Sequence, residues 1–238
     1  MARLKKNDPR TLVFAPWLGV FETLKVVSGK IMFFHEHAES LCESASALGL
    51  KAPSKSLLQK VLISHTEGRL RWIVDGEGFR SLFTPEKEKS AARMTLGISE
   101  LRVGSKNWDA QYKTLSYLTH WQARMERGNF DEMVLLNEWD EIASVSMANL
   151  FWVKKGIVYT PALECGCRAG VVRNWVQKQA RVKAGRYGLD HLSSADEIFI
   201  TNSMIGIQGI SRFQSRRFSK ESTTAMLQKN WRALFKTV

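Results

Sequence analysis

The chain reads Gly166-Cys167-Arg168-Ala169-Gly170-Val171-Val172-Arg173 where a loop enters a helix predicted over roughly residues 171–182. Gly170, Val171 and Val172 therefore stand at the start of that helix. Free backbone N–H groups and the helix dipole at such a terminus favour a phosphate. Alone, the stretch would be an ordinary turn between a loop and a helix. Its meaning depends on the segments around it.

A second polar turn follows in Asp196-Glu197-Ile198-Phe199-Ile200-Thr201-Asn202-Ser203-Met204-Ile205-Gly206-Ile207. The apolar run in its first half predicts a strand, and residues 205–210 predict another. Thr201, Asn202 and Ser203 offer hydroxyl and N–H groups where the first strand ends. In isolation these would be common turn residues, but they follow a helix start that could hold the same phosphate.

Lys113 precedes both segments, in the run Tyr112-Lys113-Thr114-Leu115-Ser116-Tyr117-Leu118. Apolar residues at helical spacing predict a helix that begins near Lys113 and stops at residue 128. A lysine that forms a Schiff base must lose its proton, so it usually stands in partly desolvated surroundings. The aromatic and apolar neighbours of Lys113 suit that role. Since most lysines at helix starts are solvated, the position alone would not select it.

Two further segments complete a pattern, Gly19-Val20-Phe21-Glu22-Thr23 near the start and Ala148-Asn149-Leu150-Phe151-Trp152 in the middle. In their order and spacing the five segments resemble those of the class IV aminotransferases, and most of all the members that act as 4-amino-4-deoxychorismate lyases. The resemblance covers nearly the whole chain. It implies an α+β fold of two domains, as in D-amino acid aminotransferase, with pyridoxal 5′-phosphate bound between the domains of a homodimer.

The resemblance also implies roles for single residues. Lys113 would hold the cofactor and move the substrate proton, which makes it the candidate catalytic residue. The amides of Val171 and Val172 would bind the cofactor phosphate together with the hydroxyl of Ser203. The expected cofactor contacts are Lys113, Val171, Val172, Arg173, Asn202, Ser203, Ser144 and Ser40.

Two of these positions depart from the family pattern. Ser40, in His37-Ala38-Glu39-Ser40-Leu41, stands where the family has an arginine that clamps the phosphate. Ser144 stands five residues before Asn149, where the family has a glutamate against the pyridine nitrogen. A guanidinium makes a strong, directional contact with phosphate, and a serine replaces it with at most one neutral hydrogen bond.

The loss of the glutamate bears on the reaction. A carboxylate keeps the pyridine nitrogen protonated and makes the ring a strong electron sink, whereas a hydroxyl favours a neutral ring. Elimination depends on that sink less than transamination does, because aromatisation also drives it. Ser144 therefore favours conversion of 4-amino-4-deoxychorismate to 4-aminobenzoate and pyruvate, a step of folate synthesis. An amino acid aminotransferase and a non-catalytic relative without cofactor remain the alternatives.

The organisation of the chain follows from periodicity. We expect an N-terminal α/β domain over residues 1–104, a connection over 105–112 and a β-rich domain over 113–238 that carries Lys113. Helices are predicted over residues 35–48, from Ser54 through Ser64, and after Ser219. Strands are predicted within residues 12–34 as a hairpin, and at 70–74, 94–101, 133–136, 142–145, 149–153, 157–159 and 198–201.

Charge and composition limit the classes of molecule that the protein is expected to bind. The net charge of +12 comes from 35 basic and 23 acidic residues, which are scattered and accompany no recognised nucleic-acid motif. We therefore expect a basic surface that draws a small anionic substrate toward a cleft, rather than a nucleic acid. No apolar run approaches the ~20 residues of a membrane span. The sequence thus predicts a soluble, cytoplasmic protein with no membrane partner.

Cysteines and histidines do not indicate a metal site. Cys42, Cys165 and Cys167 are an odd number, and the Cys165–Cys167 spacing suits neither a zinc site nor a redox pair, so we expect reduced thiols. His35 and His37 would diverge on a helix, so they are expected to be surface or packing residues. Glu22 matches a family motif near the active-site mouth, but on an alternating strand it could equally face a partner chain.

Overall fold

The computed structural model describes residues 18–61, 66–86 and 93–236. Most neighbouring strands are antiparallel, and the helices do not follow each strand as they do in a βαβ fold, so the fold is α+β, as the sequence predicts. Within the described residues, no helix combines the length and the apolar character needed to cross a lipid bilayer.

The chain folds into two compact units whose boundaries differ from those expected. Unit 1 comprises Met1–Glu88 and Tyr112–Tyr117, and unit 2 comprises Lys89–Gln111 and Leu118–Val238. The expected division placed the boundary near residue 104 and Lys113 in the second domain. Unit 2 instead begins before the strand at 94–103, and the short segment that carries Lys113 returns to unit 1. Long-range strand pairing, which periodicity does not report, causes both differences.

Unit 1 is a four-stranded sheet with the order β2-β1-β3-β4, in which all neighbours are antiparallel. Its strands are β1 (Gly19–Val27), β2 (Lys30–Ile31), β3 (Gly68–Asp75) and β4 (Gly78–Pro85). Burial alternates along β1 and β3, as it does in a sheet that packs on one face. The hairpin predicted between residues 12 and 34 is confirmed from Gly19, but its return strand ends at Ile31 and Phe34 already begins a helix. The first residues of the prediction, up to residue 17, lie outside those described.

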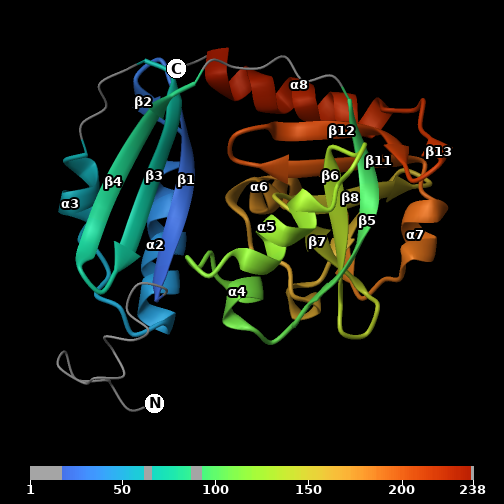
Figure 1. The fold of residues 1–238 in the computed structure, drawn as a ribbon. Coiled ribbons are helices and arrows are strands. Elements are labelled where there is room, and N and C mark those ends of the chain that lie inside the picture. The colour runs from blue at the N-terminus through green and yellow to red at the C-terminus, as the bar shows by residue number, and fades with distance from the viewer. Residues whose placement is uncertain (1–17, 62–65, 87–92, 237–238) are drawn as a thin grey trace. The chain divides into compact units, whose positions relative to one another are not determined.

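Helix α2 (Phe34–Ala47) covers one face of this sheet (Figure 1). Leu41 and Ala45 are fully buried against Leu24 and Trp72 of the strands. Burying a leucine side chain of this kind stabilises the fold by roughly 1.5–3 kcal/mol. Gly49, in the left-handed region at φ 72°, follows the helix end and lets the chain turn away.

Helix α3 (Lys55–Gln59) is shorter than the helix expected from Ser54 through Ser64. The Ser54 hydroxyl does cap it, since it accepts a hydrogen bond from the Leu57 N–H at 3.2 Å. Residues 62–65 lie outside those described, so the end of the predicted helix is not tested beyond Val61.

Lys113 does not start a helix, so that prediction is wrong. Its segment is extended and pairs with the edge of β1: the Phe21 N–H donates to the Lys113 carbonyl at 2.8 Å, and the Leu115 N–H donates to the Gly19 carbonyl at 2.8 Å. The helix predicted from the apolar spacing begins only at Leu118, as α5 (Leu118–Met125). The backbone hydrogen bonds of the Lys113 segment to β1 outweigh the helical preference of the residues before Leu118.

Unit 2 is built on a nine-stranded mixed sheet with the order β10-β9-β8-β11-β12-β5-β6-β7, to which β13 adds beside β12. Its strands are β5 (Met94–Val103), β6 (Glu132–Asn137), β7 (Ile142–Val145), β8 (Asn149–Lys154), β9 (Ile157–Pro161), β10 (Val182–Gly185), β11 (Glu197–Asn202), β12 (Gly206–Phe213) and β13 (Arg216–Arg217). Strand β5 runs parallel to both β12 and β6, which places it inside unit 2.

Unit 2 also contains helices. They are α4 (Trp108–Gln111), α5, the 3-10 turn η1 (Leu163–Cys165), α6 (Val171–Gln179), α7 (Leu189–Ser193) and α8 (Ser222–Lys236). The main core of unit 2 gathers buried residues of β6, β8 and β11, among them Val134, Trp152 and Ile200. Helix α6 begins at Val171 as predicted and ends at Gln179, three residues earlier than expected.

Candidate active site

Lys113 lies opposite Phe21 in the short ladder with β1, so the two side chains share one face of unit 1. The Lys113 Nζ lies 4.5 Å from the centre of the Phe21 ring and 5.4 Å from the centre of the Tyr117 ring. The two rings meet edge to face, with centroids 5.8 Å apart. Cation–π attraction to both rings therefore positions the ammonium group.

Glu22 follows Phe21 on β1 and points to the opposite, core-facing side of the strand, where it is 7% exposed. One of its carboxylate oxygens lies 2.8 Å from His37 Nδ1, and the other accepts a 2.8 Å hydrogen bond from the Ser40 hydroxyl. Burial alone would raise the pKa of Glu22, but the hydrogen bond and charge of His37, the charge of Lys113 and the Ser40 bond hold it below its usual value. Glu22 is therefore ionised at neutral pH.

This network settles two sequence interpretations. Glu22 faces helix α2 and not a partner chain, because its alternation on β1 puts it on the same side as Val20 and Leu24. His37 is a buried packing residue, as expected. The Ser40 hydroxyl, at the position where the family has its phosphate arginine, donates to Glu22.

In unit 2, helix α6 begins without a side-chain cap, since no side chain accepts a hydrogen bond at its N-cap Gly170. The main-chain N–H groups of Val171 and Val172 lie in its first turn, where the helix provides no carbonyl to accept their hydrogen bonds. Asn149 holds the loop that leads into α6, because its Nδ2 donates a hydrogen bond to the Arg168 carbonyl at 2.9 Å. A Cβ at Gly170 would lie 2.2 Å from the Asn149 Oδ1, so only glycine fits there without a shift.

Asn202 shapes the second polar turn. Its Oδ1 accepts hydrogen bonds from the N–H groups of Met204 and Ile205, both at 2.9 Å, and its Nδ2 donates to the Met147 carbonyl at 3.0 Å. Ser203 lies inside the turn that these bonds close. Asn202 thus acts on the geometry of this turn through its side chain, in the way an Asx turn does.

Two buried hydroxyls of unit 2 lack a hydrogen-bond partner among the described residues. They belong to Ser144 on β7, which is 6% exposed, and to Thr201 on β11, which is fully buried. Leaving a buried polar group unsatisfied costs about 1–3 kcal/mol. Such atoms are expected where a bound molecule supplies the partner. These hydroxyls and the start of α6, which has no side-chain cap, all belong to unit 2 and are groups to which a phosphorylated heterocycle could bond.

The Arg173 side chain is bonded within unit 2, and its expected contact with the cofactor stays a prediction. Its guanidinium is 3% exposed, donates to the Pro161 carbonyl at 3.1 Å and to the Gln177 side chain at 3.0 Å. These bonds brace α6 against the end of β9. Only the main-chain N–H of Arg173 shares the first turn of α6 with the two valines.

The predicted residues therefore form two groups, each within one unit. Unit 1 holds Lys113 and Ser40, and unit 2 holds Ser144, Val171, Val172, Arg173, Asn202 and Ser203. The sequence interpretation missed the bonds of His37 and Ser40 to Glu22. The signal was present, because strict alternation puts Glu22 among buried apolar residues, and a buried carboxylate needs partners.

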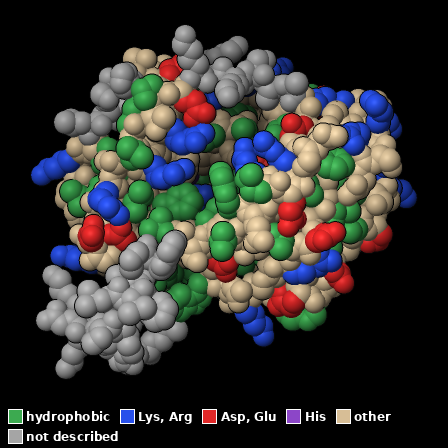
Figure 2. All heavy atoms as spheres, in the orientation of Figure 1, with side chains coloured by type: hydrophobic (Ala, Val, Ile, Leu, Met, Phe, Trp, Pro, Cys, Tyr) green, Lys and Arg blue, Asp and Glu red, His purple; other side chains and the backbone are tan. Residues whose placement is uncertain are grey.

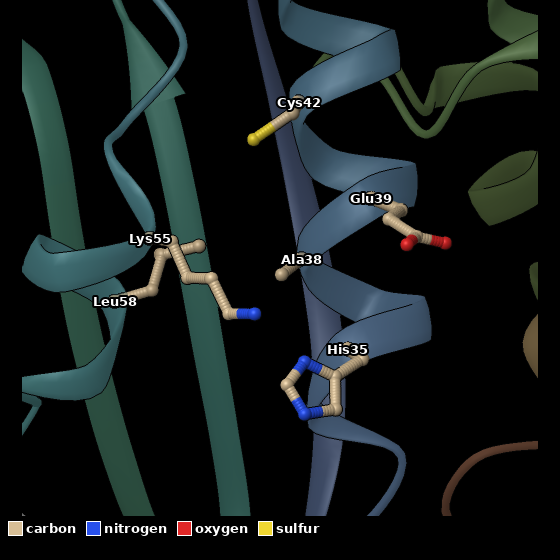
Figure 3. Close-up of a pocket in the computed structure, with 6 residues that line it drawn as sticks. All are labelled: His35, Ala38, Glu39, Cys42, Lys55 and Leu58. Atoms are coloured by element: carbon tan, nitrogen blue, oxygen red, sulfur yellow. The ribbon is translucent and has the colours of Figure 1, made fainter.

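A small hollow lies between α2 and α3, away from these residues. It has a volume of about 180 Å³ and is lined by His35, Ala38, Glu39, Cys42, Lys55 and Leu58. In Figure 3 the side chains of His35 and Lys55 extend into the space between the two helices, while Glu39 points away from Lys55. The hollow is smaller than the ~300 Å³ of a typical ligand pocket, and it contains no residue of the predicted site.

Cys42, Cys165 and Cys167 carry free thiols, and burial raises the pKa of Cys167 to about 11. Among the residues described, no group of three or more His, Cys, Asp or Glu side chains could hold a metal ion. On the face drawn in Figure 2, Lys and Arg side chains are dispersed, with acidic and neutral ones between them.

The chain is similar in sequence to a family of known proteins. The family model described as amino-transferase class IV matches residues 19–213. An aminodeoxychorismate lyase of Bacillus subtilis is 30% identical over 135 residues, which cover 54% of this chain and 46% of that protein. A D-alanine aminotransferase of Listeria monocytogenes is 23% identical over 223 residues, covering 81% of this chain and 77% of that protein. The match to the lyase thus spans less than half of that relative's length.

Solved structures share the fold. The 4-amino-4-deoxychorismate lyase of Pseudomonas aeruginosa has a TM-score of 0.82 at 22% identity, covering 98% of this chain and 96% of that one. The branched-chain amino acid aminotransferase of Escherichia coli has a TM-score of 0.83 at 18% identity, covering 94% and 86%. An aminotransferase of Brucella abortus, bound to the cofactor PLP, has a TM-score of 0.79 at 18% identity, covering 92% and 90%. Since the family model spans most of the chain and includes both polar turns and Lys113, the chain belongs to the class IV aminotransferases, a family of enzymes.

Proposed function

We propose that this protein is a pyridoxal 5′-phosphate enzyme that converts 4-amino-4-deoxychorismate to 4-aminobenzoate and pyruvate. The observation that carries the proposal is Ser144, a buried and uncharged group without a partner among the described residues, at the position that faces the ring nitrogen in the family. When bound, the cofactor supplies an electron sink for the substrate's bonding electrons. With a hydroxyl beside the ring that sink is weak, which favours the reaction that aromatisation also drives.

The chain's own residues have separate tasks in this proposal. The N–H groups of Val171 and Val172 and the hydroxyl of Ser203 bind the cofactor phosphate. Asn149 and Asn202 hold the turns that carry these groups. Lys113 attaches the cofactor through Nζ and afterwards moves the substrate proton at that atom, with Phe21 and Tyr117 keeping it in place.

An amino acid aminotransferase is the second candidate. The breadth of the match to D-alanine aminotransferase, which covers 81% of this chain, favours it. A relative without catalysis is the third, because Ser40 supplies no guanidinium for the phosphate and its hydroxyl is bonded to Glu22. The three candidate functions differ in the products that the protein would release from each substrate.

Incubation with each substrate discriminates them. Given 4-amino-4-deoxychorismate and cofactor, we expect the protein to release pyruvate and 4-aminobenzoate in equal amounts. Alanine of either hand with 2-oxoglutarate is expected to turn over far more slowly. Rapid amino-group transfer without pyruvate from the chorismate derivative would replace the lyase by the aminotransferase, and no turnover of either would leave the non-catalytic relative.

A further inference from the structure

Glu132 is a buried acidic residue at the start of β6, and the proposed reaction gives it no task. Its side chain lies in the interior of unit 2, where it is 5% exposed. Burial raises the pKa of Glu132, against the lowering effects of a hydrogen bond from Ser146 and of the charge of Arg124. Burying a carboxyl group costs free energy, so its hydrogen-bond partners indicate what it holds in place.

The partners of Glu132 belong to the turn between β7 and β8, residues 146–148. The Ser146 hydroxyl donates to one carboxylate oxygen, and the Met147 N–H also donates to this carboxyl group. The other oxygen lies 3.6 Å from Arg124 Nη1. The Ser146 main chain is tied to β6 as well, since its N–H donates to the Met133 carbonyl at 2.9 Å. Glu132 therefore fixes the β7–β8 turn to the start of β6.

The same turn holds the second polar turn of the site. The Met147 carbonyl accepts a 3.0 Å hydrogen bond from Asn202 Nδ2. Asn202 Oδ1 accepts hydrogen bonds from the N–H groups of Met204 and Ile205, both at 2.9 Å. A continuous series of hydrogen bonds thus runs from the buried carboxyl group on β6, through Met147 and Asn202, to the polar turn that contains Ser203.

We propose that Glu132 is a positioning residue that fixes the β7–β8 turn and thereby holds Asn202 and the polar turn around Ser203 in the conformation that binds the cofactor phosphate. The inference rests on the proposed function, which gives Ser203 that contact. Ser144 is held separately, by its pairing with Leu135 in the ladder between β6 and β7. Glu132 therefore acts on the phosphate end of the cofactor and not on the ring.

Hydrogen exchange in the cofactor-free protein tests the series of hydrogen bonds. Glu132→Gln keeps the size of the side chain, but an amide nitrogen cannot accept a hydrogen bond as a carboxylate oxygen does. We expect the Met204 and Ile205 N–H groups to exchange about fivefold faster in this variant, equivalent to ~1 kcal/mol in the free energy of local opening. Amide-resolved NMR measures both rates. Unchanged rates in the folded variant would overturn the proposal, whether or not the protein binds a cofactor.

The affinities of two probes measure the consequence for phosphate binding. Glu132→Gln should bind pyridoxal 5′-phosphate about fivefold more weakly than the unsubstituted protein does, and should bind pyridoxal, which lacks the phosphate, with unchanged affinity. An equal loss for both probes would overturn the proposal, because a general loss of structure has that effect. If the unsubstituted protein binds both probes equally, the proposed function loses its phosphate site, and hydrogen exchange decides whether Glu132 holds the turn.

Glu126→Gln is the matched control, because the Glu126 carboxylate also accepts a hydrogen bond from a buried serine. This bond, from the Ser99 hydroxyl at 2.7 Å, joins the end of α5 to β5 and not to the β7–β8 turn. The control should change neither the exchange rates nor the two affinities. If Glu132→Gln does not fold, Ser146→Ala replaces it, since it removes a donor to the same carboxylate and should also speed exchange in the polar turn. Unchanged exchange in Ser146→Ala, or an equal increase in Glu126→Gln, would contradict the proposal.

Discussion

Ser144 is the residue on which the choice between two chemistries depends. Its hydroxyl is buried and has no partner among the described residues, so a bound ring nitrogen would be its first hydrogen-bond partner. A hydroxyl can donate to a neutral ring nitrogen but cannot stabilise a charged one as a carboxylate does. In the proposed function, Ser144 would therefore leave the cofactor ring without the charge that a carboxylate would supply.

Ser144→Glu should therefore shift the protein toward transamination. A carboxylate beside the ring favours its protonated form, and the ratio of amino-group transfer to pyruvate release should rise about tenfold, which corresponds to ~1.4 kcal/mol in relative barrier height. Both products are measured from the same preparation with saturating cofactor. Ser144→Ala is the control, since it removes the hydroxyl without adding charge. A ratio that stays the same in Ser144→Glu would show that this position does not face the ring.

Glu197 shows a different use of a buried carboxylate, at the start of a helix. It accepts hydrogen bonds from the Ser222 hydroxyl at 2.9 Å, from the Thr223 N–H at 3.0 Å, and from the N–H and hydroxyl of Thr224, both at 2.8 Å. These groups open α8, where a negative charge is favoured. Burial alone would raise the pKa of Glu197, but the bonds from Thr224, Thr223 and Ser222 outweigh it and hold the pKa below its usual value.

Glu197→Gln should destabilise the protein at neutral pH by ~1–2 kcal/mol, in the range of a lost helix cap. Because the folded pKa is depressed, the carboxylate stabilises the fold above its unfolded pKa, and that contribution is lost as pH falls through the folded pKa. The difference between the two proteins in urea unfolding should therefore shrink in acid. Glu77→Gln, at a side chain that is 82% exposed, should change little at either pH. A difference that grows in acid would contradict the assignment.

At the scale of the elements, α6 depends on one glycine. Gly170 has ordinary backbone angles of φ −65° and ψ 145°, so its necessity comes from space and not from conformation. A Cβ there would lie 2.2 Å from the Asn149 Oδ1. Asn149 would have to move, and with it the Arg168 carbonyl that it holds.

Gly170→Ala should consequently weaken cofactor binding about tenfold, equivalent to ~1.4 kcal/mol, because it would shift the first turn of α6, which we propose binds the phosphate. Titration with pyridoxal 5′-phosphate, followed by absorbance, measures the change. Gly76→Ala is the control, since a Cβ at Gly76 meets nothing within 4 Å. Equal affinity in the Gly170 and Gly76 variants would remove α6 from the phosphate site.

The elements also show what the sequence could and could not predict. The strands at Gly68–Asp75 and Asn149–Lys154, and the start of α6 at Val171, were predicted because each has a strong local pattern. The helix expected at Lys113 was wrong, because pairing with β1 depends on residues some ninety positions earlier. Strand β4 was missed, since its exposed face shows little alternation of apolar and polar residues. Local preference is visible in one sequence, and long-range pairing is not.

At the scale of the whole molecule, helix α5 carries an apolar stripe. Leu118, Trp121 and Met125 are 70%, 55% and 67% exposed and share one side of the helix at spacings of three and four. Large exposed apolar side chains in one stripe are typical of a surface that another protein covers. Since the resemblance predicts a homodimer, we propose that a second copy covers this stripe.

Trp121→Glu should then convert the dimer to a monomer, because it places a charge in the middle of the buried stripe. Size-exclusion chromatography with light scattering measures the mass directly. Trp139→Glu is the matched control, since Trp139 is 50% exposed but lies in the turn between β6 and β7. A Trp121→Glu protein that keeps the mass of the unsubstituted protein would exclude the stripe as the dimer surface.

Lys113 is the residue that we propose attaches the cofactor, and both candidate activities require it. The most direct measurement adds pyridoxal 5′-phosphate to the protein, reduces it with borohydride and maps the peptides by mass. We predict a coloured protein whose reduced cofactor is attached to the Lys113 peptide, and a Lys113→Ala protein without that label and without either activity. A label on another lysine, or a colourless protein that takes up no cofactor, would contradict the account.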